Sequence, residues 1–398
     1  MGNQNVSVFW NKRTNSLIPY VPGEQPRDRE FIKLNTNENP YPPSPNVVAA
    51  IEETLSGGDK SSLSNGERLR LYPDPLCTGF TEAVAAAYGV NPSQVFPGNG
   101  SDEVLAFAFG AFFESRRNLV DVHVNDASAV LFPDITYSFY PVYANLWDIP
   151  FKTIPLQEDF SINLDDYNLD AYSTAGKDLC IGNSTADSGG VIIPNPNAPT
   201  GRALPVSPLL QLARKLEQNH RVLIVDEAYI AFGAESLVPY IADYPNLLTV
   251  HTLSKSASLA GLRTGFAIGS EELIEGLFRI RNSFNSYTLD AFALAGGAAA
   301  VLDKSYYDRI NKKVIATRER TAAALLAMGF KVIPSKANFL FVSFPGRSGS
   351  DLFQALRDRG ILVRHFNKPR IDDYLRVSIG TDKDMDVFLA VCKDITDV

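Results

Sequence analysis

Apolar runs of strand length alternate with segments of helical periodicity through the middle of the chain. The stretch RVLIVDEAY (221–229) is continuously apolar before its acidic end, which is typical of a strand buried on both faces of a sheet. In the preceding segment, VSPLLQLARKLEQN (206–219), leucines recur at helical spacing, and we expect Ser207 to be the N-cap and Pro208 the first helical residue. Other short strands are predicted at AVLF (129–132), GVII (190–193), LLTV (247–250) and GFAIG (265–269). This alternation predicts a largely parallel sheet within an α/β domain.

The two ends of the chain depart from this alternation. The first 45 residues are rich in proline and asparagine and predict an extended arm with turns. From about residue 290, alanine-rich helical segments precede further short strands and a last helix. These strands are expected at NFLFVSF, ILVRHF and YLRVSIG. We therefore predict an N-terminal arm at 1–45, a large domain at 46–288 and a smaller α+β C-terminal domain at 289–398.

Composition narrows the class of protein. A chain of 398 residues suits two domains, and its 45% hydrophobic and 21% charged residues are ordinary for a globular protein. The net charge of -8 argues against a dedicated nucleic-acid binder, which needs a basic face. Two polar stretches, SGGDKSSLSNGER (56–68) and STADSGG (184–190), are expected to be surface insertions.

Cysteine and histidine usage suggests a location and argues against a metal site. The three cysteines, Cys77, Cys180 and Cys392, have no paired spacing, which favours the reducing cytoplasm over a disulfide framework. The four histidines stand far apart, so no metal site is expected. The first residues lack a signal pattern, and the longest apolar stretches are too short to span a bilayer.

The stretch GNGSDE predicts a seat for an anion. Gly98 and Gly100 permit a tight turn, and Ser101 and Asp102 fall where a helix begins, so free amides and the helix dipole would face a negative group. Glu103 occupies the third glycine position of a dinucleotide fingerprint, which makes a nicotinamide-binding dehydrogenase the least favoured alternative. Taken alone, this stretch is better explained by a well-capped helix.

Aromatic and acidic residues at strand ends suggest a flat, cationic ligand. Tyr137 opens a helix, and its ring would cover such a ligand or pack in the core. The turn NPNAPTGR follows a strand, where α/β proteins bind ligands. Asp226 ends a buried strand, which is costly for a carboxylate unless a cation pairs with it, and Tyr229 would reach the same ligand.

Lys255 is the candidate reactive group. It lies between two serines after a strand, with Arg263 one loop away. Partial burial and neighbouring positive charge lower the pKa of an amine, and a neutral amine forms a Schiff base with an aldehyde. Arg263 and Ser254 together would hold a phosphate dianion. A solvated surface lysine is the ordinary alternative, but the combined residues suit a flat, phosphorylated, nitrogen-bearing aldehyde, pyridoxal 5'-phosphate.

In this order the motifs resemble the fold-type-I pyridoxal-phosphate aminotransferases, most closely the histidinol-phosphate aminotransferase family. The resemblance extends from the arm to the last helix. It is carried by LNTNENPYPPSP, YPDP, GNGSDE, ITYSFYPVY, NPNAPTG, DEAYIAF, TLSKSASLAGLRTGF, ANFLFV, GILVRHF and YLRVSIGT. It implies a large domain with a mostly parallel seven-stranded sheet flanked by helices, and a smaller C-terminal domain.

The resemblance also assigns roles to residues. It implies that Lys255 forms the Schiff base and shuttles the proton, that Asp226 pairs with the pyridinium nitrogen, and that Tyr229 bonds the phenolic oxygen. Tyr137 is expected to stack on the ring. The phosphate cup is expected to comprise Ser101, Asp102, Thr252, Ser254 and Arg263, with Tyr72 of YPDP donated by the second subunit of a homodimer.

One position departs from the family pattern. Where the family has asparagine directly before PTG, this chain has Ala198. Either Asn197 shifts into the missing contact with the phenolic oxygen, or Tyr229 makes that contact alone.

The expected substrate rests on two arginines. Arg376 matches the general carboxylate arginine, while Arg364, Tyr20 and Asn37 resemble further substrate contacts. Two arginines and a tyrosine suit a phosphate dianion better than a lone carboxylate, although Arg364 would also suit a surface ion pair.

The resemblance implies transamination between L-histidinol phosphate and 2-oxoglutarate, a step of histidine biosynthesis. The alternatives are an aromatic-amino-acid aminotransferase, a threonine-phosphate decarboxylase or, from another class, a non-catalytic binding protein.

Overall fold

The computed structural model describes residues 7–20, 23–24, 30–57, 66–115, 129–167 and 189–396. Most of the two stretches expected to be surface insertions, and Cys180, lie outside these residues. Cys77 and Cys392 are buried free thiols. Within the described part of the chain, no helix has the length and apolar character needed to cross a membrane.

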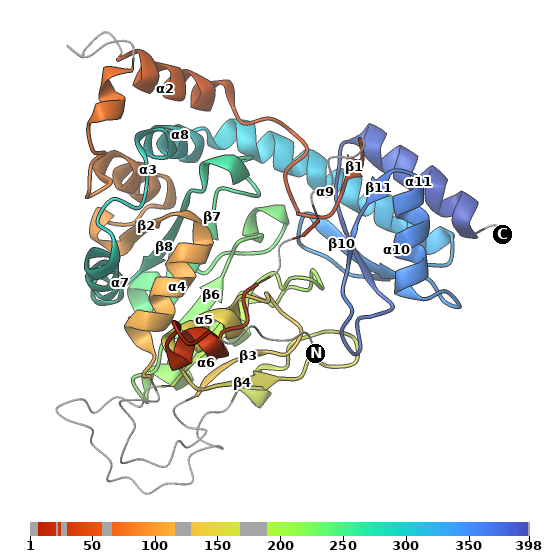
Figure 1. Cartoon of the computed structure of the whole chain (residues 1–398), viewed down its shortest axis with the longest axis horizontal. Coiled ribbons are helices and arrows are strands. Elements are labelled where there is room, and N and C mark those ends of the chain that lie inside the picture. Colours follow the sequence, from red (N-terminus) through yellow and green to blue (C-terminus); the bar gives the residue numbers. More distant parts are fainter. Residues whose placement is uncertain are drawn as a thin grey trace, which may run out of the picture.

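A seven-stranded sheet forms the larger body of the molecule, with strand order β2-β8-β7-β6-β5-β3-β4 (Figure 1). Its strands are β2 (Val95–Gly98), β3 (Val130–Pro133), β4 (Phe151–Ile154), β5 (Gly190–Pro194), β6 (Leu223–Asp226), β7 (Leu247–Thr252) and β8 (Gly265–Gly269). The five strands from β4 to β7 run parallel, and β8 runs antiparallel to both of its neighbours. The predicted mostly parallel sheet is therefore confirmed.

Helices cover both faces of this sheet because successive strand residues point to opposite sides. On β6, Leu223 and Val225 pack into one core cluster, with α3 (Thr78–Tyr88) and α6 (Val206–Glu217), while Ile224 packs into a second cluster on the other face. The second cluster contains residues of α4 (Gly100–Phe112), α5 (Tyr140–Trp147) and α7 (Glu271–Phe284). All four β6 residues are buried, as expected of a central parallel strand.

Helix α6 begins earlier than the sequence suggested. Pro205, with extended backbone, is its N-cap, and Val206 is its first residue. The prediction of Ser207 as N-cap and Pro208 as first residue is therefore wrong. Val206 is 8% exposed, so its burial places the start of the helix upstream of the residue with the better capping side chain.

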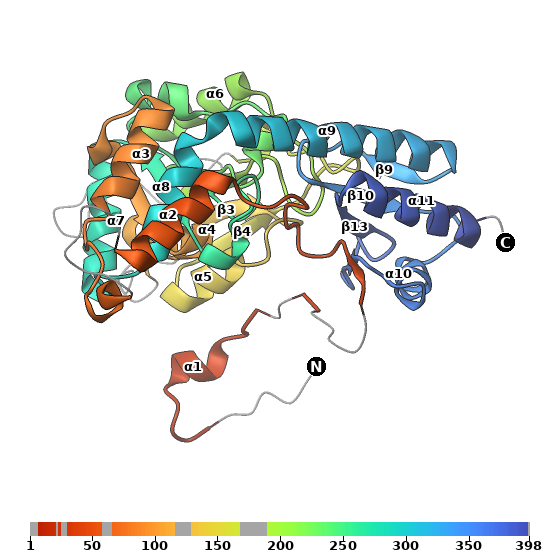
Figure 2. The same cartoon turned by 90° about the horizontal axis from the view of Figure 1, so that it is seen from above.

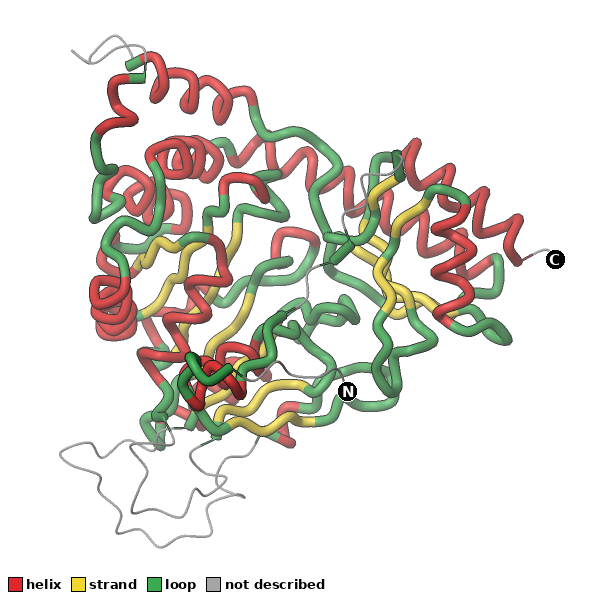
Figure 3. The backbone as a smooth tube through the Cα atoms, viewed as in Figure 1, coloured by secondary structure: helices red, strands yellow, loops and turns green. Residues whose placement is uncertain are grey.

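Two helices join the large sheet to a smaller one. Helix α8 (Ala291–Leu302) packs against α2 (Pro45–Ser56) and α3, and α9 (Lys304–Ala327) continues from it toward the smaller sheet (Figure 2). That sheet is antiparallel with order β12-β13-β10-β9 and is separate from the large sheet (Figure 3). Its elements are β9 (Lys331–Ile333), β10 (Phe339–Ser343), β12 (Arg364–His365) and β13 (Leu375–Ser378), with α10 (Gly349–Asp358) and α11 (Asp382–Thr396).

The arm joins the small sheet region by its own strand. Strand β1 (Ile32–Lys33) pairs in parallel with β11 (Ile361–Leu362). Before it, the short helix α1 (Lys12–Ser16) contacts the large domain, where Arg13 pairs with Asp148. The arm thus contacts the large domain through α1 and the small sheet region through β1.

Candidate active site

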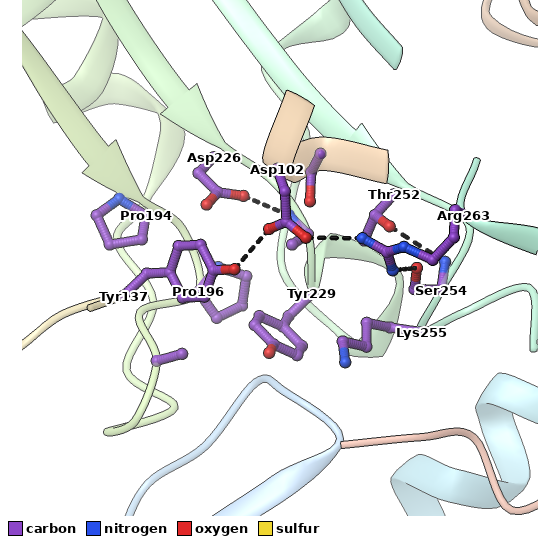
Figure 4. A pocket seen from close by; sticks show the side chains of 13 residues that line it. Asp102, Tyr137, Pro194, Pro196, Asp226, Tyr229, Thr252, Ser254, Lys255 and Arg263 are labelled. Carbon is purple, nitrogen blue, oxygen red and sulfur yellow. Dashed lines mark hydrogen bonds and ion pairs between the residues drawn. The ribbon is translucent and has the colours of Figure 1, made fainter. Parts of the chain in front are cut away.

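A cavity opens where the carboxyl ends of β5, β6 and β7 face the start of α4, the edge at which open α/β sheets bind ligands (Figure 4). Its walls come from segments far apart in sequence. It is lined by Ser101, Asp102, Tyr137, Pro194, Pro196, Ala198, Asp226, Ala228, Tyr229, Thr252, Ser254, Lys255 and Arg263.

The start of α4 forms a seat for an anion. Gly100 has a left-handed backbone (φ 76°), and a Cβ there would come 2.7 Å from the Arg263 guanidinium, so glycine allows the arginine to lie against the helix start. The Asp102 carboxylate accepts hydrogen bonds from Arg263 Nη2 (2.7 Å) and from the Tyr137 hydroxyl (2.5 Å). Its negative charge is thereby paired, and an anion at this seat would be met by backbone N–H groups of the first helical turn.

Hydroxyl groups complete this seat on the strand β7 side. Arg263 Nη1 lies 3.4 Å from Ser254 Oγ, and the Ser254 N–H donates to Thr252 Oγ1. Thr252 is the last residue of β7, and Ser101 is the second residue of α4. A guanidinium, hydroxyls and a helix N-terminus gathered in one place form a donor set that suits a phosphate dianion.

Asp226, the last residue of β6, lines the same cavity. Its carboxylate is 6% exposed and accepts hydrogen bonds from the Tyr140 hydroxyl (2.8 Å) and the Ala228 N–H (3.1 Å). Burial raises the pKa of Asp226 to about 6, against the effect of these two hydrogen bonds. Among the described residues no cation is paired with it, so this carboxylate suits a cationic nitrogen of a bound ligand.

The amine of Lys255 faces the same cavity and is tied to the arm. Its Nζ donates to the Thr36 carbonyl (3.0 Å), and the Asn39 side chain donates to the Lys255 backbone carbonyl (3.1 Å). Burial, helped by the positive charge of Arg376, lowers the pKa of Lys255 to about 8. A far larger share of this amine is therefore neutral near pH 7 than at the ordinary lysine value of 10.5, and only the neutral amine is a nucleophile.

Two tyrosines face the middle of the cavity between these groups. The hydroxyl of Tyr229 accepts a hydrogen bond from the Asn37 side chain (2.9 Å), and its ring packs edge-on against Phe339. Tyr137 lies on the other side, where its hydroxyl is fixed by Asp102 (Figure 4). The cavity thus has an aromatic wall between an anion seat and a buried carboxylate.

Two of the residues expected at the cofactor do not line this cavity. Asn197 is fully buried and donates to the Ile135 carbonyl and to Thr200, while Ala198 faces the cavity. Tyr72 is 82% exposed and stacks on Tyr287. Its position is outside the cavity of its own chain.

A second cavity adjoins the first and contains all four residues expected at the substrate. Tyr137, Tyr229 and Lys255 line both cavities, and Tyr20, Asn37, Arg364 and Arg376 line the second. The ring of Tyr20 lies 4.3 Å from that of Phe139, the N-cap of α5, which brings the arm to the start of this helix. The cavity therefore leads from the amine toward two cationic side chains of the small sheet.

Arg364 and Arg376 both place their guanidinium groups near the ring of Phe366. The guanidinium carbon of Arg364 lies 5.6 Å from the centre of the Phe366 ring, and that of Arg376 lies 5.7 Å from it. Arg376 Nη2 also donates to the Asn35 carbonyl, whereas its buried Nε has no partner among the described residues. A buried donor without a partner is costly unless a ligand accepts from it.

Three positioning groups were missed by the sequence reasoning. Tyr140 stands in the aromatic run ITYSFYPVY, where nothing in the sequence distinguishes it from a core residue. Thr36 acts through its backbone carbonyl, so no side-chain pattern predicts it. Asn39 belongs to a polar run on the arm whose contact with Lys255 depends on the tertiary structure.

Comparison with known proteins agrees with this geometry. The family described as aminotransferase class I and II matches residues 29–391. A histidinol-phosphate aminotransferase of Clostridium acetobutylicum is 52% identical over 390 residues, covering 98% of this chain and 99% of that protein. Another, of Aromatoleum aromaticum, is 46% identical over 390 residues, covering 98% and 99%.

Among solved structures, the chain is similar in fold to a histidinol-phosphate aminotransferase of Sinorhizobium meliloti crystallised in complex with pyridoxal 5'-phosphate. The TM-score is 0.80 at 22% sequence identity, with 99% of each chain covered. At this identity the likeness concerns the fold.

Proposed function

This chain belongs to the aminotransferase class I and II family, and from that premise we propose that it transfers an amino group between L-histidinol phosphate and 2-oxoglutarate, a step of histidine biosynthesis. Pyridoxal 5'-phosphate is its cofactor. Support for the substrate comes from the curated relatives, which carry this activity in their names, and from the two arginines beside the cavity.

The residues present fit this cofactor at three points. The Arg263 guanidinium lying on Gly100, with the hydroxyls of Ser101 and Ser254, suits its phosphate. The unpaired, buried Asp226 suits its ring nitrogen, and Lys255 is the amine that faces the same cavity. When bound, the cofactor supplies an electron sink that stabilises the carbanion left when a proton leaves the substrate Cα.

In the proposed mechanism Lys255 carries the proton. With a pKa near 8, its amine would accept the proton that leaves the substrate Cα and would then act as the acid that gives it back to complete the amino transfer. The Thr36 carbonyl, 3.0 Å from Nζ, gives the amine an acceptor when it is not engaged by the cofactor. Asn39 donates a hydrogen bond to the backbone carbonyl of Lys255, so the backbone of this residue stays in place when its side chain moves.

Asp226 and the two tyrosines set the orientation and charge of the ring. The Asp226 carboxylate would keep the ring nitrogen of the bound cofactor protonated, and Tyr140 fixes the direction of that carboxylate. Tyr137 would cover one face of the ring and Tyr229 would donate to its phenolic oxygen, while Asn37 donates to the Tyr229 hydroxyl. Because Ala198 lacks an amide and Asn197 is engaged elsewhere, Tyr229 makes the phenolic contact alone.

The register of Arg364 and Arg376 is the observation that supports a phosphorylated substrate. These residues are direct partners on antiparallel strands β12 and β13. Two like charges placed opposite each other are unfavourable unless an anion lies near both. A phosphate dianion provides two negative charges for this pair, and Tyr20 and Asn37 add polar contacts in the same cavity.

The proposed active unit is a homodimer. Leu69, Leu71, Tyr72 and Leu76 lie on one exposed stretch, and Tyr72 stacks on the exposed Tyr287. Such a grouping of large apolar side chains is typical of an interface. In this proposal Tyr72 reaches the cofactor phosphate of the second subunit, which explains why it lies outside the cavity of its own chain.

Two further proposals concern the domain boundaries and the cellular location of the protein. We keep 1–45 as an arm, 46–288 as a large domain and 289–398 as a small domain, with α8 lodged against helices of the large domain. We also propose a cytoplasmic location, because the described cysteines, Cys77 and Cys392, are free thiols. Limited proteolysis and cell fractionation would test these assignments.

The decisive experiment is a half-reaction monitored by the cofactor spectrum. Addition of L-histidinol phosphate to the cofactor-loaded enzyme should convert the aldehyde form to the amine form, and 2-oxoglutarate should reverse the change. Phenylalanine and O-phosphothreonine serve as competitors, because they represent the aromatic aminotransferase and decarboxylase alternatives. Preferential conversion by phenylalanine, release of CO2 from O-phosphothreonine, or no conversion by any amino donor would refute the proposed substrate.

A further inference from the structure

Arg370 connects the two domains at the rim of the substrate cavity. It lies in the segment between β12 and β13, and its guanidinium reaches the large domain. Nη1 donates to Asp134 Oδ2 (3.0 Å), and Nη2 donates to the carbonyls of Leu156 (2.7 Å) and Gln157 (3.1 Å). One side chain thus makes three charge-assisted hydrogen bonds across the domain boundary.

The backbone at this residue indicates that the contact is built rather than incidental. Arg370 has a left-handed conformation (φ 72°), which is unfavourable for any residue with a Cβ. Such a conformation persists where surrounding contacts over-determine it. The three hydrogen bonds of the guanidinium are the contacts that do so here.

On the small-domain side, this contact fixes the segment that carries the arginine-stacking ring. The Lys368 N–H donates to the Phe366 carbonyl, and the Ile371 N–H donates to the Lys368 carbonyl, so residues 366–371 form a tightly turned unit. Phe366, Lys368 and Ile371 all line the substrate cavity. The Arg364 and Arg376 guanidiniums both lie against the Phe366 ring, so a shift of this ring would move the surface on which both rest.

On the large-domain side, the same contact fixes the segment that leads to Tyr137. Asp134 follows β3 directly, and its Oδ1 accepts from the N–H groups of Ile135 (2.8 Å) and Leu156 (2.9 Å). The carboxylate therefore joins the end of one strand to the turn after the next. Tyr137, which lines both cavities, lies two residues beyond Ile135.

We propose that Arg370 is a positioning residue that sets the separation between the two substrate-facing arginines and the cofactor-covering tyrosine. It is not among the residues that line either cavity, and it acts through Phe366 on one side and through Asp134 on the other. This inference rests on the proposed function where it specifies a phosphorylated donor. It predicts that loss of the contact weakens donor binding far more than it slows the chemical step.

The test compares Arg370→Gln, Arg370→Lys and Asp134→Asn in the cofactor-loaded enzyme. Arg320→Gln is the matched control, because it removes an exposed ion pair with Asp386 within the small domain, away from the cavity. Single-turnover conversion of the cofactor spectrum gives the apparent donor Kd and the limiting rate separately. Melting temperature and cofactor affinity report on the fold and the cofactor site.

Arg370→Gln should raise the apparent Kd for L-histidinol phosphate about tenfold and change the limiting rate less than twofold, because displaced arginines lose charge-assisted hydrogen bonds to the donor phosphate and not to the reacting carbon. The apparent Kd of Arg370→Lys should lie between those of the wild-type enzyme and Arg370→Gln. Lysine keeps the positive charge beside Asp134 but loses the two hydrogen bonds to backbone carbonyls. The double variant Arg370→Gln/Asp134→Asn should be no weaker than Arg370→Gln alone, as expected for two members of one contact.

An unchanged donor Kd in Arg370→Gln, or a rise matched by Arg320→Gln, would overturn the inference. An equal loss in limiting rate and cofactor affinity would also overturn it, because it would indicate general disruption. L-glutamate, which needs Arg376, separates this result from failure of the proposed substrate. If the wild-type enzyme ignores L-histidinol phosphate, the proposed function fails, while a raised Kd for L-glutamate in the variant would still support the positioning role.

Discussion

Arg364 and Arg376 are directly opposite each other on neighbouring antiparallel strands, and both guanidiniums lie against the ring of Phe366. Two positive groups in this register repel each other in the ligand-free protein. The small sheet therefore stores an unfavourable interaction that an anionic ligand relieves. A site of this kind exchanges some stability of the free enzyme for discrimination in favour of a dianion.

Replacement of Arg364 by glutamine should separate these two effects. Without ligand, the variant should be slightly more stable, by about 0.2–1 kcal/mol, because the cross-strand repulsion is removed. With L-histidinol phosphate, kcat/KM should fall about 10–100-fold, which corresponds to one charge-assisted hydrogen-bond set of about 1.5–3 kcal/mol. Thermal denaturation and steady-state kinetics measure the two effects.

Lys368→Gln is the control for general loss of positive charge, since Lys368 lines the same cavity but is exposed. It should reduce kcat/KM much less than Arg364→Gln. Equal turnover of L-histidinol phosphate by Arg364→Gln and the wild-type enzyme would contradict a phosphate contact at this arginine.

Replacement of Lys255 by alanine should abolish turnover while the cofactor still binds. A positioned proton shuttle contributes about 10²–10⁴-fold to the rate, and loss of the covalent attachment adds to that. Borohydride reduction followed by mass spectrometry should attach cofactor to the wild-type chain and not to the variant. The exposed Lys312, replaced by alanine, should retain both properties. Normal turnover by Lys255→Ala would exclude the proposed role.

The sequence allowed the main elements of the site to be predicted because most of them end parallel strands. Asp226 ends β6 and Lys255 follows β7, and the carboxyl ends of parallel neighbours meet at one edge of a sheet. The fully apolar runs predicted those strands in the correct places. A local pattern was therefore enough to bring two distant residues to one cavity.

Other features depend on packing that no local pattern encodes. Tyr140 is fully buried in α5 and would be taken for a core residue, yet its hydroxyl donates to Asp226. Asn197 was a candidate for the phenolic contact, but its amide donates to the Ile135 carbonyl of another loop. In both cases the hydrogen-bond partner of the side chain is a residue far away in the sequence, so only the tertiary structure decides which contact forms.

Replacement of Tyr72 by phenylalanine tests the proposed dimer. If its hydroxyl donates to the cofactor phosphate of the second subunit, the Kd for the cofactor should rise about 5–10-fold, which corresponds to one lost hydrogen bond of about 1 kcal/mol. Cofactor titration by fluorescence measures this change, and Tyr240→Phe is the matched control. Sedimentation should give a dimer for all three proteins. A monomer with wild-type cofactor affinity would contradict both parts of the proposal.

The buried carboxyl of Asp226 predicts a pH dependence that the cofactor should reverse. Burial raises the pKa of Asp226 to about 6 in the folded protein, above the ordinary value of 3.8. A raised folded-state pKa gives stability that is fully present below the unfolded value and lost as pH rises through the folded value. The cofactor-free enzyme should therefore lose on the order of 2–3 kcal/mol from this group between about pH 4 and pH 6.

Comparison with Asp226→Asn isolates this contribution, because the neighbouring Glu227, whose pKa burial raises to about 7, is common to both proteins. Without cofactor, Asp226→Asn should be the more stable protein at pH 8, and the advantage should vanish near pH 4. With saturating cofactor the order should reverse at pH 8, because the cationic ring nitrogen pairs with the ionised carboxylate and not with an amide. Chemical denaturation across this pH range measures both differences. If Asp226→Asn gained as much stability from the cofactor as the wild-type enzyme, the proposed pairing of Asp226 with the ring nitrogen would be wrong.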